Sequence, residues 1–359
     1  MPAEGRRDAI GPARLAELLA DPEWCEAPVS DGASPLVVVD VSGPGDMAEL
    51  AGLAKDAGLA GQTDPVVGEP APAPWRVLVG VVDAPTQDAA PGLLDVCLCS
   101  GTAGDGWVRV PDLDTAVTIA HEACTASPRA AGVLTQVLRL NEGRGPAAGL
   151  ATESLAYSML LSGSEFRMWR EGHPARAPRP SPDPVTTHWD DEAVQIVLNR
   201  PEVRNAYDPA MRDALVDALR AVGSHPARME VRLTGAGPDF CSGGDLSWFG
   251  AAVDATEAHA VRTARSPGPL LSALGAITSV HGACVGAGIE LPAFCPRIEA
   301  HPDSWFQLPE VSMGLIPGAG GTASILARIG RRRLAWMALS GVRVDAAEAL
   351  SWGLIDVIT

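Results

Sequence analysis

The sequence predicts an α/β fold in two parts: an amino-terminal α/β domain that ends in helices, and a carboxyl-terminal domain of alternating strands and helices. Apolar runs of strand length alternate with helix-period runs in the carboxyl-terminal part, which favours parallel pairing of the strands. A Pro-rich stretch without apolar periodicity predicts a linker at 176–190. The predicted domains are therefore 1–175 and 191–359.

The elements expected in the amino-terminal part are the less regular ones. A helix near 12–24 is followed by strands and then by helical runs. The Pro-, Gly- and Ala-rich stretch 59–74 indicates an exposed loop. The expected strands are 35–41, 75–82 and 93–100, and the expected later helices are 114–127, 128–141 and 149–172.

The carboxyl-terminal part contains a well-marked helix at 208–225. Asp208 is a suitable N-cap, Pro209 suits the first turn, and apolar residues recur at helical spacing. Runs typical of strands lie on both sides of this helix. They are 193–200, 229–237, 277–282, 295–300 and 305–310.

Composition limits the partners that the protein can have. The formal net charge of −17 argues against nucleic acid or an anionic membrane as the main partner. The seven scattered cysteines form no CxxC pair, and no apolar run reaches the roughly 18 residues of a membrane span. We therefore expect a reduced cytoplasmic protein. The histidines show no ligand spacing, so no metal site is predicted.

Two Gly-rich turns in the carboxyl-terminal part each follow a strand-like run directly. The first is 237-GPDFCSGGDLSWF-249 and the second is 281-HGACVGAGIEL-291. Backbone N–H groups are free at a turn or a helix start, and glycines let a ligand approach them. Turns on neighbouring strands can aim two N–H donors at one oxygen, which is the geometry of an oxyanion hole. Plain connecting turns are the alternative interpretation.

Two glutamates lie in apolar surroundings near these turns. If a helix begins near Ala287, Glu290 lies one turn into it, where the helix dipole favours a carboxylate. Glu310 follows a strand-like run and precedes Pro- and Gly-rich turns. Burial raises and separates carboxyl pKa values, so such a pair suits general acid–base chemistry. A capping or ion-paired carboxylate is the alternative for Glu310.

These motifs resemble those of the enoyl-CoA hydratase/isomerase (crotonase) superfamily. They follow the order and spacing of that family across nearly all of 190–359. The resemblance implies a spiral of ββα units, an acyl-CoA thioester substrate and a homo-oligomer, either a trimer or a hexamer. The matching segments are 198-LNRPEVRNAYDPAM-211, 239-DFCSGGDL-246, 281-HGACVGAGIEL-291, 306-FQLPEVSMGLIPGAGGT-322 and 340-SGVRVDAAEALSWGLID-356.

The resemblance implies roles for particular residues by their position. The N–H groups of Gly244 and Ala287 would polarise the thioester carbonyl, although the family usually has Gly at the second position. Glu290 and Glu310 match the two glutamates of hydratases, of which one activates water for C3 and the other supplies the C2 proton. No cofactor is implied beyond the coenzyme A of the substrate. The positions implied to bind coenzyme A are Arg204, Asn205, Ala206, Gly243, Asp245, Leu246 and Ser247.

The chain departs from the family pattern in the place of its covering helices. Most members carry, after the last matching motif, helices that cover the ligand. Here the runs 127–139 and 152–174 resemble those late helices, so 1–175 is interpreted as a degenerate crotonase-like copy that keeps them. Its acidic candidates near the glutamate positions are Asp95 and Asp112. We expect the helices at 114–172 to complete the site of the same or a neighbouring subunit.

The resemblance leaves several functions open. Hydration of a 2-enoyl-CoA to a 3-hydroxyacyl-CoA is favoured, because members that isomerise double bonds commonly keep only the second glutamate. A CoA isomerase and a CoA-thioester hydrolase or carbon–carbon lyase would use the same oxyanion hole. A non-catalytic acyl-CoA-binding or assembly subunit is the alternative of another class. Trp248 and Phe249 indicate a bulky apolar pocket lining, but the acyl chain itself stays open.

Overall fold

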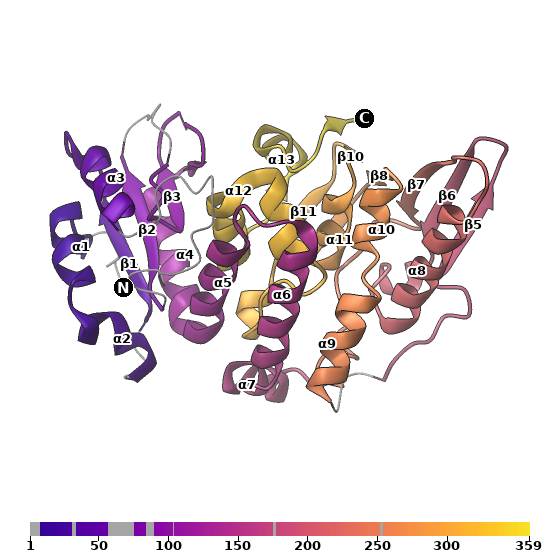
Figure 1. Ribbon diagram of the computed structural model, residues 1–359, viewed down its shortest axis with the longest axis horizontal. Coiled ribbons are helices and arrows are strands. Elements are labelled where there is room, and N and C mark those ends of the chain that lie inside the picture. The colour runs from indigo at the N-terminus through magenta and orange to yellow at the C-terminus, as the bar shows by residue number, and fades with distance from the viewer. Residues whose placement is uncertain are drawn as a thin grey trace. The chain divides into compact units, whose positions relative to one another are not determined.

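The computed structural model in Figure 1 describes residues 8–30, 34–56, 75–83, 90–102, 104–174, 177–251 and 254–359. Contacts within the chain divide it into two compact units. The first unit comprises Met1–Gly143 and Gly330–Ser340, and the second comprises Arg144–Ile329 and Gly341–Thr359. Both units mix helices with sheets, which confirms the predicted α/β class. The loop expected at 59–74 lies outside the described residues.

The first unit is built on a four-stranded parallel sheet in the order β1-β2-β3-β4. Every residue of β2 and β3 is buried, as their continuous apolar runs lead one to expect. The strands are β1 (Leu36–Asp40), β2 (Val77–Val82), β3 (Val96–Cys99) and β4 (Val108–Arg109). The first three confirm the sequence prediction, whereas β4 is too short to leave a pattern.

The helices of the first unit differ from the prediction mainly at the start. The helix expected at 12–24 is two helices, because the chain turns at Asp21 and Pro22 begins a new one. The later helices are close to the predicted ranges. The helices are α1 (Pro12–Leu19), α2 (Pro22–Ser30), α3 (Asp46–Asp56), α4 (Leu113–Ala126) and α5 (Pro128–Asn141).

The two acidic candidates of the first unit, Asp95 and Asp112, form ion pairs or hydrogen bonds within that unit. The carboxylate of Asp95 is fully buried and forms ion pairs with Arg139 at 2.5 Å and Arg331 at 2.9 Å. Asp112 is the N-cap of α4 and accepts the N–H of Thr115 at 2.7 Å. Both carboxylates therefore have structural partners. The origin of this unit as a degenerate copy stays a prediction.

The second unit contains two sheets. Six strands lie in the order β13-β10-β8-β7-β6-β5, and each neighbouring pair is parallel except β6 and β5. A three-stranded sheet has the order β12-β11-β9. The strands are β5 (Val185–Trp189), β6 (Ala193–Leu198), β7 (Glu230–Gly235), β8 (Ile277–Val280), β9 (Ala283–Val285), β10 (Arg297–Ala300), β11 (Trp305–Gln307), β12 (Val344–Asp345) and β13 (Val357–Ile358).

The helices of the second unit include the one that the sequence marks most clearly. The carboxylate of Asp208 caps α8 by accepting the N–H of Met211 at 2.8 Å, as predicted. The helices are α6 (Pro146–Leu161), α7 (Ser164–Gly172), α8 (Pro209–Gly223), α9 (Ala255–Ala264), α10 (Gly268–Ala273), α11 (Ala287–Glu290) and α13 (Ala346–Trp352), with short turns η1 (Pro201–Val203), η2 (Pro292–Phe294) and η3 (Glu310–Met313).

One helix is shared by the two units. In α12 (Gly321–Ser340) the backbone leaves the helical conformation at Gly330, whose φ is 75°. That conformation favours glycine because a Cβ is strained there. The helix is broken at this point, and its two segments belong to different units.

The boundary between the units differs from the predicted linker at 176–190. Residues 185–189 of that segment form β5, which pairs with β6. The units divide after Gly143, because α6 packs against α9 and α7 packs against η3, both within the second unit (Figure 1). The two helices that the sequence assigns to 1–175 thus belong with the carboxyl-terminal domain.

Asn205, which was predicted to bind coenzyme A, is fully buried, and its side chain forms hydrogen bonds with two neighbouring loops. Its φ of 53° lies in the left-handed region, which Asn tolerates better than most residues. Its side-chain oxygen accepts the N–H of Arg200 at 2.8 Å. Its amide nitrogen donates to three backbone oxygens at 2.8–3.1 Å, those of Ala236, Asp239 and Phe240. The side chain of Asn205 therefore faces the protein, not a ligand.

Replacing Asn205 by Ala is expected to destabilise the protein by roughly 1–3 kcal/mol, because buried partners lose their hydrogen bonds. A lower midpoint of thermal unfolding, followed by circular dichroism, checks this. Asn199→Ala is the matched control, since that amide donates one bond to the Asp183 carbonyl near the surface. An equal midpoint for the two variants would contradict the role given to Asn205.

Candidate active site

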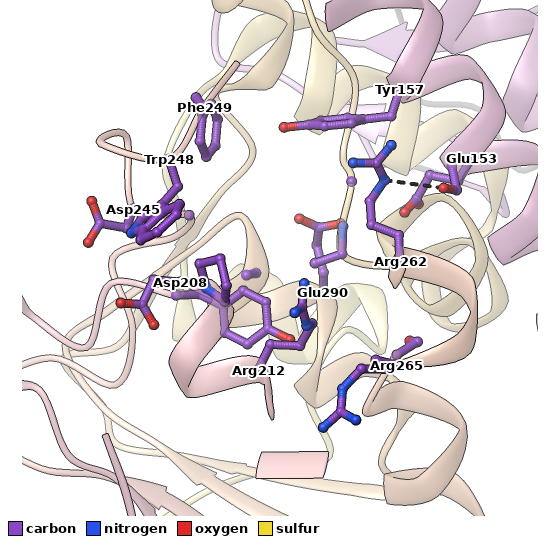
Figure 2. Close-up of a pocket in the computed structure, with 18 of the residues that line it drawn as sticks. Glu153, Tyr157, Asp208, Arg212, Asp245, Trp248, Phe249, Arg262, Arg265 and Glu290 are labelled. Atoms are coloured by element: carbon purple, nitrogen blue, oxygen red, sulfur yellow. Dashed lines mark hydrogen bonds between the residues drawn. The ribbon is translucent and has the colours of Figure 1, made fainter. Parts of the chain in front are cut away.

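A cavity of about 210 Å³ lies within the second unit. Both predicted glutamates, Glu290 and Glu310, line it, and so do Gly244 and Ala287. Trp248 and Phe249 are also on its wall, as predicted. Figure 2 shows Glu290 pointing into the space between these two aromatic side chains and helix α6. The sequence thus identified residues that the fold brings to one cavity.

The two Gly-rich turns lie side by side beneath this cavity. Cys241 in the first turn donates its N–H to the Ala283 carbonyl at 3.1 Å and accepts the Val285 N–H at 3.0 Å. Close packing of the turns requires glycine at one point. A Cβ on Gly288 would lie 2.3 Å from the Cys241 carbonyl oxygen. Backbone pairing and this contact fix the two turns against each other.

The N–H groups of Gly244 and Ala287 are available for a ligand. Neither donates a hydrogen bond to any residue of the described ranges. Ala287 is the first residue of α11, where a helix leaves its N–H groups without internal partners. Because both residues line one cavity, their N–H groups can converge on one oxygen.

Glu290 is held by a turn at the start of α12. It is the last residue of α11, its side chain is only 2% exposed, and its Oε2 accepts the N–H groups of Ala319 and Gly321, each at 2.8 Å. A Cβ on Gly321 would lie 2.8 Å from Glu290 Cγ, so the turn approaches the carboxylate closely. Burial raises the pKa of Glu290 to about 7, although these N–H groups favour the ionised form.

Glu310 faces Glu290 across Gly286. A Cβ on Gly286 would lie 2.5 Å from Oε1 of Glu310 and 3.8 Å from Oε1 of Glu290, so the two carboxyl groups flank this glycine. Glu310 Oε2 is buried and has no hydrogen-bond partner in the described part of the chain. Burial, and then the charge of Glu290, raise the pKa of Glu310 well above its usual value. Both effects favour the protonated form of Glu310.

The buried glutamates predict a stability that falls as the pH rises. A carboxyl whose pKa is raised in the folded state stabilises the protein below its ordinary pKa of 4.5, and this contribution is lost as the pH rises through about 7. The loss is on the order of a few kcal/mol, since one pKa unit corresponds to about 1.4 kcal/mol. Thermal unfolding midpoints across this pH range measure it.

The double variant Glu290→Gln with Glu310→Gln is the control for this pH dependence. Its unfolding midpoint should vary less with pH than that of the unchanged protein, because two raised carboxyl groups no longer ionise. An identical pH dependence for the two proteins would contradict the burial argument.

The positions predicted to bind coenzyme A come together only in part. The segments 204–207 and 242–245 pair through their backbones, since Ser242 donates to the Arg204 carbonyl at 2.9 Å and Asp245 donates to the Tyr207 carbonyl at 2.8 Å. Arg204 and Leu246 are exposed and Ala206 is half-buried, whereas Asn205 and Gly243 are buried. This backbone strip leads from the surface to Gly244.

Asp245 and Ser247 organise the first turn. The Asp245 carboxylate accepts the N–H and the hydroxyl of Ser247 at 3.0 and 2.6 Å. It also pairs with the buried guanidinium of Arg200, which reaches Asp208 at 3.0 Å. No local pattern in the sequence indicates Arg200, because its partners lie in three different segments. Asp245 also lines the cavity, beside Gly244.

Helix α6 adds residues to the site that the sequence did not single out. Glu153 and Tyr157 line the cavity, which confirms that a helix from 114–172 covers this site in the same chain. From α9, Arg262 donates to the Ser154 hydroxyl at 3.1 Å, and its guanidinium lies 5.0 Å from the ring centroid of Tyr157 (Figure 2). Only the helical pattern of 152–174 pointed to this contribution.

No group of three or more His, Cys, Asp or Glu suited to a metal ion occurs in the ranges that the structure covers. Among the same residues, no helix combines the length and apolar character that crossing a membrane requires.

Comparison with known proteins links the second unit to one family. Residues 190–359 match the family model described as enoyl-CoA hydratase/isomerase. The chain is 33% identical over 167 residues to the 2,3-dehydroadipyl-CoA hydratase of Escherichia coli (strain K12), which covers 45% of this chain and 63% of that protein. It is 31% identical over 181 residues to the (E)-benzylidenesuccinyl-CoA hydratase of Thauera aromatica, which covers 49% of this chain and 70% of that protein.

Among solved structures, the crystal structure of an enoyl-CoA hydratase from Thermoplasma volcanium GSS1 is 30% identical. The match covers 49% of this chain and 71% of the Thermoplasma volcanium chain, with a TM-score of 0.46. The chain spans less than two thirds of the length of the Escherichia coli relative.

Proposed function

Because this chain belongs to the enoyl-CoA hydratase/isomerase family, we propose that its cavity hydrates a 2-enoyl-CoA to a 3-hydroxyacyl-CoA. One observation carries the proposal. Two buried carboxyl groups, Glu290 and Glu310, flank Gly286 in a cavity that is also lined by Gly244 and Ala287, whose N–H groups have no acceptor among the described residues. Hydration needs a base, an acid and an oxyanion site within reach of three consecutive atoms, and this arrangement offers all of them.

The thioester carbonyl oxygen would accept both free N–H groups. Addition to C3 of a conjugated thioester moves negative charge onto this oxygen as an enolate forms. N–H groups that are already oriented stabilise that charge without reorganisation. Gly244 and Ala287 suit this role because neither N–H has another acceptor among the described residues. Ala287 supplies its backbone N–H as well as Gly would.

The surroundings of the two glutamates support a different role for each. Glu290 accepts the N–H groups of Ala319 and Gly321, which favour its ionised form, so it is the base that takes a proton from water. The oxygen of that water forms the bond to C3. Glu310 has no such donors on Oε2 and is more strongly held in the protonated form, so it is the acid that protonates C2.

The atoms balance over one cycle. Water supplies the hydroxyl at C3, its proton goes to Glu290, and the proton of Glu310 goes to C2. The cycle closes when the proton on Glu290 returns to Glu310, directly or through water. The two carboxyl groups lie on either side of Gly286, which keeps that path short.

An absorbance assay tests the proposed function. Crotonyl-CoA and longer 2-enoyl-CoAs are mixed with the protein, and the conjugated enone absorbance should fall. Binding of these thioesters without any loss of absorbance would overturn the hydratase proposal. No change in absorbance would indicate a non-catalytic acyl-CoA-binding subunit. A fall in absorbance with release of free thiol would instead indicate a CoA-thioester hydrolase, and a fall with a shifted double bond an isomerase.

The partners are proposed on the same basis. Coenzyme A enters as part of the substrate, and no separate cofactor is required by the steps above. The homo-oligomer, a trimer or a hexamer, stays a prediction that light scattering of the purified chain tests. The cytoplasmic location likewise stays a prediction.

A further inference from the structure

Glu153 is a third buried carboxyl group in the cavity, and the proposed chemistry does not use it. It lies on α6, and its side chain is 2% exposed. Its Oε1 accepts the N–H of Gly320 at 2.7 Å. Its Oε2 accepts both the N–H and the hydroxyl of Thr322, each at 2.8 Å. A carboxyl group with three donors is held firmly in place.

Glu153 and Glu290 share one short turn. Going along the chain, the N–H of Ala319 donates to Glu290, that of Gly320 to Glu153, that of Gly321 to Glu290 and that of Thr322 to Glu153. The donors alternate because successive N–H groups of this turn point to opposite sides. The turn 319–322 is thus held between a carboxyl group of α6 and a carboxyl group of α11.

Side chains of the surrounding elements pack closely against the turn. A Cβ on Gly318 would lie 2.5 Å from the ring of Tyr157, and a Cβ on Gly320 would lie 2.5 Å from the ring of Phe294. A Cβ on Gly321 would meet Glu290 itself at 2.8 Å. The glycines let the turn approach both helices, and Glu153 is the polar contact that fixes it from the α6 side.

The surroundings of Glu153 shift its pKa in the same direction as that of Glu290. Burial, and then the charge of Glu290, raise the pKa of Glu153 to about 8. The charge of Glu153 in turn helps to raise the pKa of Glu310, and Arg262 and His259 of α9 contact the hydroxyl of the neighbouring Ser154. Burial likewise raises the pKa of Glu290, to about 7.

We propose that Glu153 is the positioning residue for Glu290, acting through the 319–322 turn. From α6 it fixes the turn so that the N–H groups of Ala319 and Gly321 reach Glu290 and keep it ionised as the base. It acts on the reaction only through Glu290. This inference rests on the proposed function, and it gives α6 a part in catalysis beyond covering the cavity.

Substitutions of Glu153 test the proposal through kcat and its pH dependence. Glu153→Ala is expected to lower kcat on crotonyl-CoA by about 10- to 100-fold, since displacement of a catalytic group by 1 Å can cost that much. KM should change little. The acidic limb of the kcat–pH profile should move to higher pH, because Glu290 loses N–H bonds to its ionised form. Glu153→Gln keeps the shape of the side chain and part of its hydrogen bonding. Its kcat and the acidic limb of its kcat–pH profile should therefore lie between those of the unchanged protein and those of Glu153→Ala.

The matched control is Leu155→Ala, two residues along the same helix. Its side chain is 59% exposed, and kcat, KM and the pH profile should be unchanged. A folded Glu153→Ala variant with the pH profile of the unchanged protein would overturn the proposal, as would a lower unfolding midpoint with normal kcat. If Glu153→Ala does not fold, Glu153→Gln decides by the same criteria.

A second measurement separates this inference from the proposed function. The carboxyl carbon of Glu290 is followed by ¹³C NMR across pH in the unchanged protein and the Glu153 variants, with Glu290→Gln to assign the signal. The titration should move to higher pH in Glu153→Ala. A protein that turns over no enoyl-CoA but shows this shift loses the proposed function and keeps the link between the two glutamates. An unmoved titration removes that link whatever the activity.

Discussion

Replacing either Glu290 or Glu310 by Gln should lower kcat for 2-enoyl-CoA hydration by roughly 10²–10⁴-fold, the usual contribution of a general acid or base. Gln keeps the size of each side chain but can neither take a proton from water nor give one to C2. KM should change much less, because the N–H groups of Gly244 and Ala287 still bind the thioester. Initial rates on crotonyl-CoA measure the effect.

The double variant sharpens this expectation. Because the two glutamates serve one reaction step, its kcat should fall little below that of the worse single variant. Glu257→Gln is the control, since Glu257 lies on the exposed side of α9. Full activity of either single variant would contradict the role given to that residue.

Replacing Ala287 by Pro should lower kcat by roughly 10²–10³-fold, the usual cost of losing one oxyanion-hole donor. Pro removes the backbone N–H and nothing else that the mechanism needs. Ala287 is the first residue of α11, a position where Pro suits a helix. The same crotonyl-CoA assay, with circular dichroism to confirm folding, measures the loss.

The control for the backbone donor is Ala287→Gly. It keeps the N–H and should keep kcat near that of the unchanged protein. If Ala287→Pro folds and also keeps its kcat, the thioester oxygen is bound elsewhere. If both variants lose activity, the change reflects the shape of the turn and not its donor.

The parts of the site that the sequence predicted are local. Ala287 and Glu290 lie in one Gly-rich turn and the short helix after it, so spacing alone places the carboxylate one turn from the free N–H. The helix at 209–223 could also be predicted from local sequence, because its N-cap, its first-turn Pro and its apolar stripe all lie in or next to it. Gly244 and Glu310 were predicted as site residues from their positions in the motifs that resemble the family, and both line the cavity.

The parts that the sequence missed depend on contacts between distant segments. Glu153 accepts hydrogen bonds from residues that follow it in the sequence by 167 and 169 positions, so no local pattern reveals its partners. The unit boundary differs for the same reason, since α6 joins the second unit through its packing on α9. Asn205 lies on the backbone strip expected to meet coenzyme A, but its side chain is drawn into the protein by four hydrogen bonds.

Hydration in isotopically labelled water measures directly whether the oxygen of water is added to C3. The protein is incubated with crotonyl-CoA in H₂¹⁸O, and the product is analysed by mass spectrometry with fragmentation. The proposed mechanism predicts a 3-hydroxyacyl-CoA that carries one ¹⁸O at C3 and an unlabelled thioester carbonyl, and its formation should be lost in Glu290→Gln. Unchanged crotonyl-CoA, or label in a free carboxylic acid in place of the C3 hydroxyl, would contradict it.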